Sequence, residues 1–339
     1  MTARQITAVA PYQVVLKETD FQEPGKNEAL IKSEYSLTNT GTELAVFTGL
    51  DAELSETFAY PVVQGRTNIG TIEKLGKGLD DLSLGDFVLS FGPHASHFVI
   101  RRDLIVSKVP ADIEPQTACF ARMAAVSISA VRSAELTAGD QVLILGQGIV
   151  GNMSAQLFQI SGAQVMVVDL SDSRLEVSRQ CGISNAINPT NVELKAAVSG
   201  WTEGRGPRIV IEAVGEPELI RSAVDLVAKH GQVILLGTPR KSVAMDLGQM
   251  LLRIHADDIT LKGSYLWDVP NHPTPRVQHS VSEHVSAIFN WLRDGLLTVK
   301  PLLTHVYSPD QCQEAYERMQ QDKDGCQSVL FDWRQENEG

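Results

Sequence analysis

The sequence has few cysteines, and their spacing gives them no shared structural role. Cys119, Cys181, Cys312 and Cys326 are scattered over 339 residues without a CxxC pair. A disulfide framework or a structural zinc cluster needs cysteines at close and regular spacing. We therefore expect four reduced thiols packed in the interior.

Long hydrophobic runs are also missing. No apolar stretch approaches the roughly 18 to 20 residues that are needed to span a bilayer. The N-terminal stretch MTARQITAVAPYQVV is too short and too interrupted by polar residues for a secretion signal. These absences predict a cytoplasmic protein that has no membrane partner.

Positive charge is in the minority. The chain has 29 Lys and Arg residues against 41 Asp and Glu residues, a net charge of −12, with no long block of one sign. This balance excludes the basic surface that nucleic acids and anionic membranes require, and leaves a small molecule as the expected partner. A chain of 339 residues with 43% hydrophobic residues can bury a large core, and its length favours two domains.

The first part of the chain, to about residue 110, has an all-β pattern of short strands separated by Gly, Pro and Asp turns. The expected strands are EALIKSEYSL (28–37), VVQGRTNIGTIEKLG (62–76), DFVLSFG (86–92) and HFVIRRDLIVSKVP (97–110).

Strands and helices alternate in the middle of the chain. Continuous Val, Ile and Leu runs predict strands at 142–146, 164–169, 208–215, 232–237 and 259–267, and amphipathic segments lie between most of them. This alternation predicts a parallel sheet covered by helices on both faces. After it we expect two helices, 279–295 and 308–321, and a closing strand, 327–333.

The strongest motif is LGQGIVG, which places Gly146, Gly148 and Gly151 between a strand and a helix. Glycines at this spacing allow a tight turn and a close approach of the backbone to a pyrophosphate, which the helix amides then bind. The next strand ends at Asp169, whose carboxylate can bind ribose hydroxyls and would repel a ribose phosphate. The pattern predicts NAD(H) rather than NADP(H), although Arg174 lies close in sequence.

Several motifs in a fixed order resemble the medium-chain dehydrogenase/reductase superfamily, which includes the zinc-type alcohol dehydrogenases. They are GTEL (41–44), PVVQGRTNIGTI (61–72), LSLGDFV (82–88), LTAGDQVLILGQGIVG (136–151), EAVG (212–215), VILLG (233–237) and ITLKGS (259–264). The resemblance implies an α/β fold in which a Rossmann domain, 123–265, is inserted in a GroES-like β domain, 1–122 and 266–339. The family's use of the Rossmann edge strands implies a homodimer.

The resemblance also implies the residues that bind the dinucleotide. They are Gly146, Gly148, Ile149, Val150, Gly151, Asp169, Arg174, Val214, Gly215, Leu236 and Gly237.

Zinc members of this superfamily place metal ligands at positions where this sequence has other residues. Thr40 replaces the first ligand, Arg66 the second, and the third should fall within 121–123, which reads Ala-Arg-Met. A hydroxyl and a thioether are poor zinc ligands, and a guanidinium repels the cation. We therefore expect no metal, and we expect the nearby His94 and His97 to be surface or hydrogen-bonded residues.

Three residues are the catalytic candidates: Thr40, Thr42 and Arg66. Thr42 matches the family's proton-relay hydroxyl, while Arg66 could polarise a substrate oxygen, bind a carboxylate, or form a salt bridge with Glu43. Glu43 itself is expected to be structural. The candidates for the substrate pocket are Tyr35, Tyr60, Arg122, Tyr265 and Trp267.

By its resemblance the chain is expected to be an enzyme that interconverts a secondary alcohol and a ketone with NAD(H) and without zinc. The motif NTGTE (39–43) is similar to the corresponding segment in a group of proteins that contains bacteriochlorophyllide dehydrogenases and threonine dehydrogenase-like proteins. The substrate could be a polyol, a sugar, a hydroxy acid or a hydroxyethyl group. Two alternatives are open: a zinc-free reductase of enones, enoyl thioesters or quinones, and a dinucleotide-binding protein without turnover.

Overall fold

The computed structural model describes residues 2–51, 58–277 and 279–334. Its contacts divide the chain into two compact units, which we describe separately. Unit 1 comprises residues 1–122, 269–294 and 302–339, and unit 2 comprises 123–268 and 295–301. The domains predicted from the sequence, 1–122 with 266–339 and 123–265, stay a proposal.

Unit 1 is built on two sheets. The three-stranded sheet has the order β2-β1-β4, with bounds Gln13–Asp20, Thr2–Ala10 and Val62–Val63. The other sheet follows the order β15-β16-β3-β5-β6-β8, and β7 also pairs with β3. Its strands are β15, His305–Tyr307, β16, Val329–Asp332, β3, Glu28–Leu37, β5, Asn68–Leu75, β6, Phe87–Ser90, β8, Ile105–Lys108, and β7, His97–Arg101. The strands predicted over 62–76 and 97–110 are thus each two strands.

Helices also contribute to unit 1, and the expectation of an all-β N-terminal part is wrong at α1, Thr40–Thr48. This helix ends at Gly49, which has the left-handed conformation that favours glycine (φ +85°), and it buries Ala45, Val46 and Phe47. Tertiary packing of this face offsets the weak helix preference of its Thr-Gly-Thr start. Within the described residues of unit 1, the other helices are α3, Pro115–Ala118, α10, Val281–Arg293, and α11, Cys312–Gln321.

Unit 2 is a six-stranded parallel sheet with the order β11-β10-β9-β12-β13-β14. The strands are β9, Gln141–Leu145, β10, Gln164–Val168, β11, Ala186–Ile187, β12, Ile209–Glu212, β13, Gln232–Leu235, and β14, Thr260–Gly263. The helices are α4, Ala121–Ser133, α5, Ile149–Ile160, α6, Asp172–Gln180, α7, Leu194–Trp201, α8, Pro217–Leu226, and α9, Leu247–Ala256. Short 3₁₀ segments complete the chain at Arg102–Leu104, Leu266–Asp268, Lys300–Leu302 and Pro309–Gln311.

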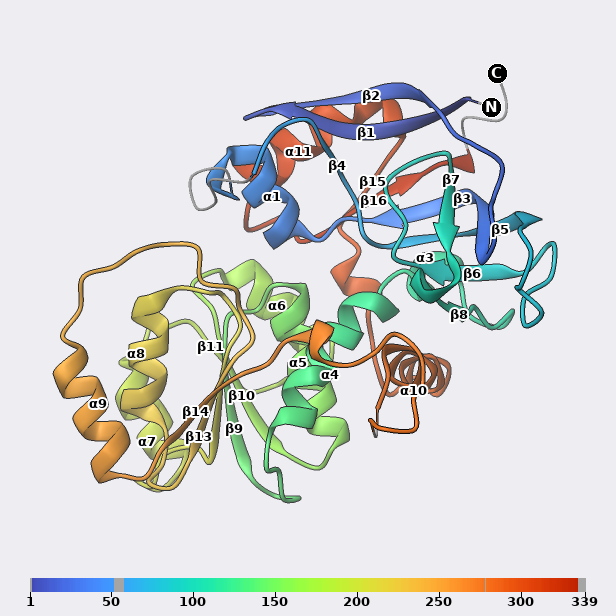
Figure 1. Cartoon of the computed structure of the whole chain (residues 1–339). Coiled ribbons are helices and arrows are strands. Elements are labelled where there is room, and N and C mark those ends of the chain that lie inside the picture. The colour runs from blue at the N-terminus through green and yellow to red at the C-terminus, as the bar shows by residue number, and fades with distance from the viewer. Residues whose placement is uncertain (1, 52–57, 278, 335–339) are drawn as a thin grey trace. The chain divides into compact units, whose positions relative to one another are not determined.

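Helices cover both faces of the parallel sheet, as the sequence predicts (Figure 1). Val142 and Ile144 of β9 face one apolar cluster with α4, α5 and α6, whereas Leu143 and Leu145 face a second cluster with α7, α8 and α9. Because side chains alternate along a strand, a strand buried on both faces needs a continuous apolar run. This requirement explains why the Val, Ile and Leu runs located the sheet.

Two further expectations concern the cysteines and the membrane. All four cysteines are free and buried, and burial raises the pKa of the Cys181 and Cys326 thiols to about 11. They are packed thiols, as predicted. No helix in the described part of the chain is long and apolar enough to cross a membrane.

Candidate functional site

The glycine loop of unit 2 lies between β9 and α5, and two of its glycines cannot be replaced without a clash. A Cβ on Gly151 would lie 1.9 Å from the carbonyl oxygen of Gly146, and one on Gly146 would lie 2.4 Å from Val214 Cγ2. Gly146 also has φ +96°, a conformation that other residues rarely adopt. Gly148 differs, because nothing lies within 4 Å of its added Cβ. The side of the loop at Gly148 is therefore open to a ligand.

The first turn of α5 offers backbone amides without a side-chain cap. Its N-cap, Gly148, has no side chain to accept a hydrogen bond, whereas Ser171, Asp246 and Ser280 cap α6, α9 and α10. Uncapped amides at a helix N-terminus bind anions, and a loop without side chains lets a pyrophosphate approach them. The two features together are what a phosphate-binding loop requires.

Asp169 ties the end of β10 to this loop. Its Oδ2 accepts the backbone N–H of Gln147 at 2.6 Å, and its Oδ1 accepts that of Ser171 at 2.9 Å. Arg174 Nη1 lies 3.7 Å from Asp169 Oδ2. The predicted ribose-binding carboxylate is thus held beside the glycine loop, and the arginine that left the choice of cofactor open is paired with it.

A second loop follows β12 at the same edge of the sheet. The buried carboxylate of Glu212 accepts the N–H groups of Val214 at 2.9 Å and Gly215 at 2.8 Å, and burial raises its pKa. A Cβ on Gly237 would lie 2.2 Å from the nitrogen of Gly215, so the loops after β12 and β13 are in contact. The crossovers from β9 lead in opposite directions to β10 and β12, and such a switch point is where open α/β sheets bind their ligands.

The residues predicted to bind the dinucleotide therefore lie together at the carboxyl ends of the parallel strands. Sequence reasoning missed Glu212, because a buried carboxylate that holds a loop leaves no pattern apart from its position at the end of a strand.

In unit 1, the three catalytic candidates differ in what their side chains contact. The Thr40 hydroxyl donates to the carbonyl of Gln327 at 3.0 Å. The half-buried Thr42 hydroxyl makes no hydrogen bond, and the exposed Arg66 makes no ion pair, within the ranges that the structure describes. The side chains of Thr42 and Arg66 are thus available to a ligand, whereas the Thr40 hydroxyl already donates its hydrogen bond to Gln327.

Glu43 is the centre of a buried polar network, not the partner of Arg66. Its carboxylate accepts hydrogen bonds from His94 Nε2 at 3.0 Å, Tyr316 Oη at 2.5 Å and the backbone N–H of Asn39 at 2.8 Å. Burial raises the pKa of Glu43, but the His94 ring and these hydrogen bonds outweigh it and lower the pKa below its ordinary value.

The network continues from His94 towards the end of the chain. His94 Nδ1 lies 2.7 Å from Ser36 Oγ, which accepts the indole N–H of Trp333 at 2.8 Å. Both nitrogens of His94 are therefore occupied, and His97 lies beside Ser96 and Glu73. The histidines are hydrogen-bonded, as expected, but no pattern in the sequence indicated that His94 and Tyr316 meet at Glu43.

The residues at the family's zinc positions do not fit a zinc ion. The Thr40 hydroxyl is bonded to a carbonyl, a guanidinium occupies position 66, and the third position falls within Ala-Arg-Met at 121–123. Among the residues that the structure describes, no group of three or more His, Cys, Asp or Glu side chains is placed to share a metal. A cation would meet positive charge here instead of thiolates and imidazoles.

The predicted pocket residues fall into both units. In unit 1, Tyr35 is buried under the guanidinium of Arg334, 4.5 Å from the ring centroid, and the Tyr60 hydroxyl donates to the carbonyl of Val46. Arg122 is buried, with its guanidinium 5.8 Å from the centroid of Phe91. Tyr265 and Trp267 are exposed residues of unit 2. Tyr35 and Tyr60 are therefore held by the fold, whereas Tyr265 and Trp267 present their rings at the surface.

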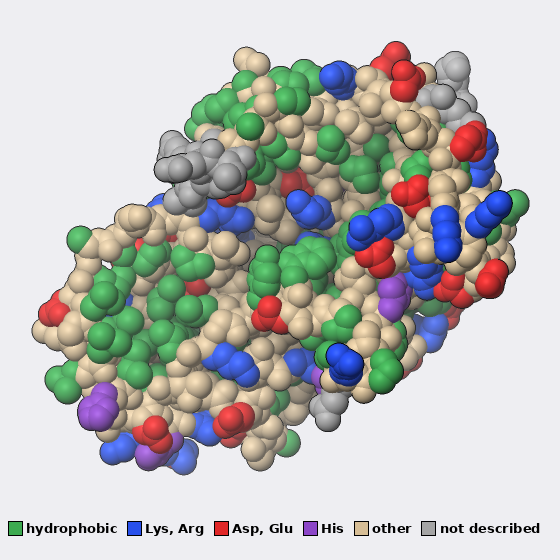
Figure 2. Space-filling model, in the orientation of Figure 1, with side chains coloured by type: hydrophobic (Ala, Val, Ile, Leu, Met, Phe, Trp, Pro, Cys, Tyr) green, Lys and Arg blue, Asp and Glu red, His purple; other side chains and the backbone are tan. Residues whose placement is uncertain are grey.

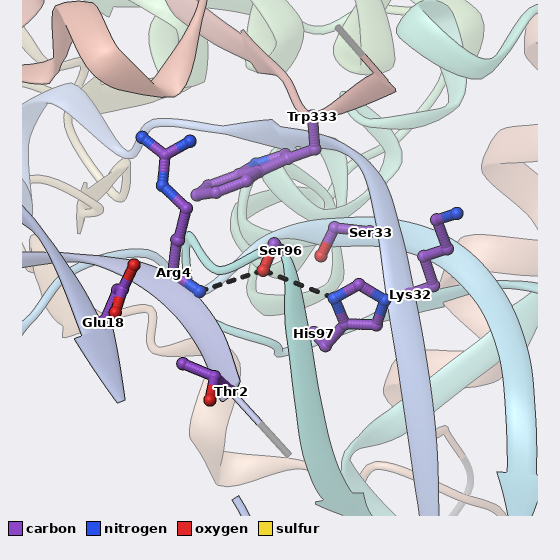
Figure 3. A pocket seen from close by; sticks show the side chains of 8 residues that line it. All are labelled: Thr2, Arg4, Glu18, Lys32, Ser33, Ser96, His97 and Trp333. Atoms are coloured by element: carbon purple, nitrogen blue, oxygen red, sulfur yellow. Dashed lines mark hydrogen bonds between the residues drawn. The ribbon is translucent and has the colours of Figure 1, made fainter. Parts of the chain in front are cut away.

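A cavity of about 280 Å³ lies elsewhere in unit 1 (Figure 3). It is lined by Thr2, Arg4, Glu18, Lys32, Ser33, Ser96, His97 and Trp333. Several of its polar groups bond one another or a neighbour: Ser96 Oγ accepts the Arg4 N–H at 3.0 Å, and the Arg4 guanidinium pairs with Asp310. None of the catalytic candidates lines this cavity, and we assign it no chemistry.

Comparison with known proteins adds three findings. Residues 150–281 match the family described as zinc-binding dehydrogenase. The chain is 27% identical to L-galactonate-5-dehydrogenase of Escherichia coli (strain K12), over 91% of this chain and 92% of the relative, and 25% identical to L-threonine 3-dehydrogenase of Pyrococcus horikoshii, over 94% and 95%. The crystal structure of galactitol-1-phosphate dehydrogenase from Escherichia coli superposes with a TM-score of 0.84 at 20% identity, covering 97% of this chain and 99% of that one.

Proposed function

The chain belongs to the zinc-binding dehydrogenase family of medium-chain, alcohol dehydrogenase-like proteins, and on this premise we propose that it interconverts a secondary alcohol and a ketone with a nicotinamide dinucleotide. The observation that carries the proposal is the open glycine loop beside Asp169. The relatives' names support a secondary alcohol, because carbon 5 of L-galactonate and carbon 3 of L-threonine both bear secondary hydroxyls.

Unit 2 is the proposed cofactor-binding unit. The amides at the start of α5 would bind the pyrophosphate, Asp169 the adenosine ribose, and the loops around Gly215 and Gly237 the rest of the dinucleotide. A nicotinamide cofactor bound there would supply the hydride acceptor that oxidation of an alcohol requires.

The preference for NAD(H) over NADP(H) depends on the charge of Asp169. Asp169→Asn keeps a carbonyl oxygen that can accept one of the two backbone N–H groups, and it removes the negative charge that repels a ribose phosphate while Arg174 stays nearby. We expect the ratio of kcat/KM for NADP to that for NAD to rise about 100-fold, a change worth about 2.7 kcal/mol. Steady-state kinetics with both cofactors measure it. Asp172→Asn, on the same helix as Arg174, is the control that should leave the ratio unchanged; an unchanged ratio in Asp169→Asn would contradict the assignment.

Proton transfer is assigned to Thr42, and no zinc takes part. The Thr42 hydroxyl would relay the proton of the substrate hydroxyl during oxidation, accepting it while passing its own proton on to a ribose hydroxyl of the bound cofactor, and Arg66 would stabilise the substrate by hydrogen bonds from its planar fork of donors. These two side chains make no hydrogen bond or ion pair in the described part of unit 1, which supports the roles.

The experiment that tests this function combines metal analysis with turnover. Protein prepared without chelator should contain no stoichiometric zinc and should reduce NAD with a secondary alcohol. Thr42→Val should lower kcat by about 100-fold, the range for loss of a proton-transfer group. Thr48→Val, at the far end of the same helix, removes a hydroxyl that is bonded to the carbonyl of Leu44 and should keep full activity.

Other outcomes separate the alternatives. Stoichiometric zinc that activity requires would make the protein a metal enzyme. NADPH-dependent reduction of enones or quinones, without alcohol oxidation, would identify a reductase, and NADH binding without turnover of either class would identify a sensor.

A homodimer is the proposed assembly. The residues of the edge strand β14 are all exposed, and hydrophobic side chains gather over α8 and α9 (Figure 2). Leu251 and Leu252 of α9 are 56% and 65% exposed. An exposed strand edge and an apolar patch are both suited to pairing with a second copy.

We expect Leu251→Glu with Leu252→Glu to convert the dimer to a monomer, because two charges would be buried at the contact. Light scattering at micromolar concentration measures the mass. Leu84→Glu, which replaces an equally exposed leucine of unit 1, should remain a dimer. A monomeric unmodified protein would refute the proposed assembly.

A further inference from the structure

The first turn of α1 carries the proposed relay residue, Thr42, although its sequence gives it little local order. Residues 40–42 read Thr-Gly-Thr, which are weak helix formers, and the side chain of the N-cap residue Asn39 does not cap the helix. A β-branched side chain has few rotamers, so the Thr42 hydroxyl follows its backbone. The position of this hydroxyl therefore depends on what fixes the turn.

Glu43 closes this turn with its own carboxylate. Its Oε1 accepts the backbone N–H of Asn39 at 2.8 Å, and its backbone N–H donates to the Asn39 carbonyl at 2.9 Å. These two hydrogen bonds join the ends of segment 39–43, and Thr42 lies inside it. The carboxylate can fix the geometry of the turn only if it is itself held in place.

The other oxygen of Glu43 is held by residues that are distant in the sequence. Oε2 accepts the hydroxyl of Tyr316 at 2.5 Å and lies 3.0 Å from His94 Nε2. Tyr316 belongs to α11, which contacts α1 (Figure 1), and its buried ring lies 5.5 Å from that of Phe47. Hydrogen bonds to an ionised acceptor are roughly twice as strong as neutral ones. One carboxylate oxygen is thus anchored in the core of unit 1 while the other closes the turn.

We propose that Tyr316 is a positioning residue: through Glu43 it holds the first turn of α1, and with it the Thr42 hydroxyl, in the geometry that proton relay requires. The proposal rests on the alcohol dehydrogenase function proposed above and adds a residue to its site. Tyr316 need not touch the reacting atoms, because a catalytic group misplaced by about 1 Å can lower a rate by about 100-fold. His94 bonds the same oxygen, so loss of Tyr316 alone loosens the turn without releasing it.

Tyr316→Phe tests the proposal, because it removes the hydroxyl and keeps the ring that packs against Phe47 and Phe331. The probe is the secondary alcohol that the unmodified protein oxidises fastest with NAD. We expect kcat to fall about tenfold, while KM for the alcohol and the NADH dissociation constant stay unchanged. Tyr307→Phe is the control: it removes a hydroxyl from the same apolar cluster that is not bonded to Glu43, and should keep kcat.

A double-mutant cycle separates the positioning of Thr42 from a general loss of stability. In Thr42→Val the relay hydroxyl is already absent, so adding Tyr316→Phe should leave kcat nearly unchanged. Independent effects would instead multiply, and the double variant would then be about tenfold slower than Thr42→Val. That result would overturn the proposal.

Hydrogen exchange measures the turn itself, without substrate or cofactor. The amides of Asn39 and Glu43 form the two hydrogen bonds that close the turn, and they should exchange about tenfold faster in Tyr316→Phe than in the unmodified protein. Exchange should be unchanged in Tyr307→Phe. Unchanged exchange in Tyr316→Phe would overturn the proposal even if kcat fell. An unmodified protein that oxidises no alcohol would refute the dehydrogenase function, whereas faster exchange in Tyr316→Phe would still show that Tyr316 holds the turn.

A second variant keeps the test decisive if Tyr316→Phe does not fold. Glu43→Gln keeps the shape of the side chain and one carbonyl oxygen, but it removes the charge that strengthens both sets of hydrogen bonds. A melting temperature close to that of the unmodified protein confirms folding. We expect the same pattern: lower kcat, unchanged KM, and no further loss in Thr42→Val. Full activity in folded Glu43→Gln would contradict the proposal.

Discussion

Gly151→Ala should abolish NADH binding at concentrations that saturate the unmodified protein. The added Cβ would lie 1.9 Å from the Gly146 carbonyl oxygen and 2.9 Å from its carbonyl carbon, and these backbone atoms can move only if the loop moves. Overpacking of this kind costs about 1 to 3 kcal/mol, and the displaced loop no longer presents the α5 amides to a pyrophosphate. We expect the NADH dissociation constant to rise at least about 100-fold, which corresponds to about 2.7 kcal/mol. Fluorescence titration with NADH measures it.

Two further glycine variants separate loss of the ligand site from loss of stability. Gly148→Ala meets nothing within 4 Å, so the melting temperature should be unchanged while the methyl group hinders the ligand and weakens binding. Gly200→Ala, in α7, also meets nothing within 4 Å and should keep full NADH affinity, with a stability gain of up to about 1 kcal/mol from helix propensity. If Gly148→Ala and Gly151→Ala bind NADH like the unmodified protein, these glycines do not form a phosphate-binding loop.

His94→Ala should destabilise the protein more than any other single substitution in the Glu43 network. The substitution removes a donor from the buried Glu43 carboxylate and leaves Ser36 without its ring partner. Leaving a buried carboxylate without one of its hydrogen-bond donors costs about 1 to 3 kcal/mol or more, because the desolvation of the charge is no longer offset. Urea unfolding at pH 7 measures the free energy. His97→Ala is the control: His97 is half-buried, its Nε2 lies 3.6 Å from Glu73, and its loss should cost at most about 1 kcal/mol.

The effect of His94→Ala should depend on pH. In the unmodified protein the pKa of Glu43 is lowered from the ordinary 4.5, so its stabilisation is complete above that value and is lost as the pH falls through the folded-state pKa. Without His94, burial dominates and raises this pKa, so acid restores stability to the variant. The difference in unfolding free energy between the two proteins should therefore be largest near pH 7 and should narrow as the pH falls below about 5. A constant difference from pH 7 to pH 4 would show that Glu43 does not carry the effect.

Much of unit 2 could be predicted because its signals are local. Strands buried on both faces are continuous apolar runs, and the glycine loop is a single stretch that ends at Gly151. In unit 1 local signals mislead at α1, where Thr40, Gly41 and Thr42 are weak helix formers and packing of the apolar face decides the structure. The hairpin of β1 and β2 was not predicted either, because its turn depends on Tyr12 adopting φ 62°.

The network around Glu43 could not be predicted from spacing. His94 lies 51 residues from Glu43 along the chain, and Tyr316 lies 273 residues from it. No local sequence pattern indicates a contact between residues so far apart. The departures of Thr40 and Arg66 from the family's ligands, in contrast, were visible in the sequence.

The pairing of β3 with β16 has a consequence for the order in which the protein can form during synthesis. β3 spans residues 28–37, but β16, which pairs with its last three residues, spans 329–332 and leaves the ribosome after nearly all of the rest of the chain. Until then β3 lacks that neighbour, and an unpaired edge is a template for association with other chains. The parallel sheet of unit 2 is translated entirely within this interval, so it can be complete while the N-terminal strands still wait. A chaperone that binds nascent chains should therefore act mainly on the N-terminal strands.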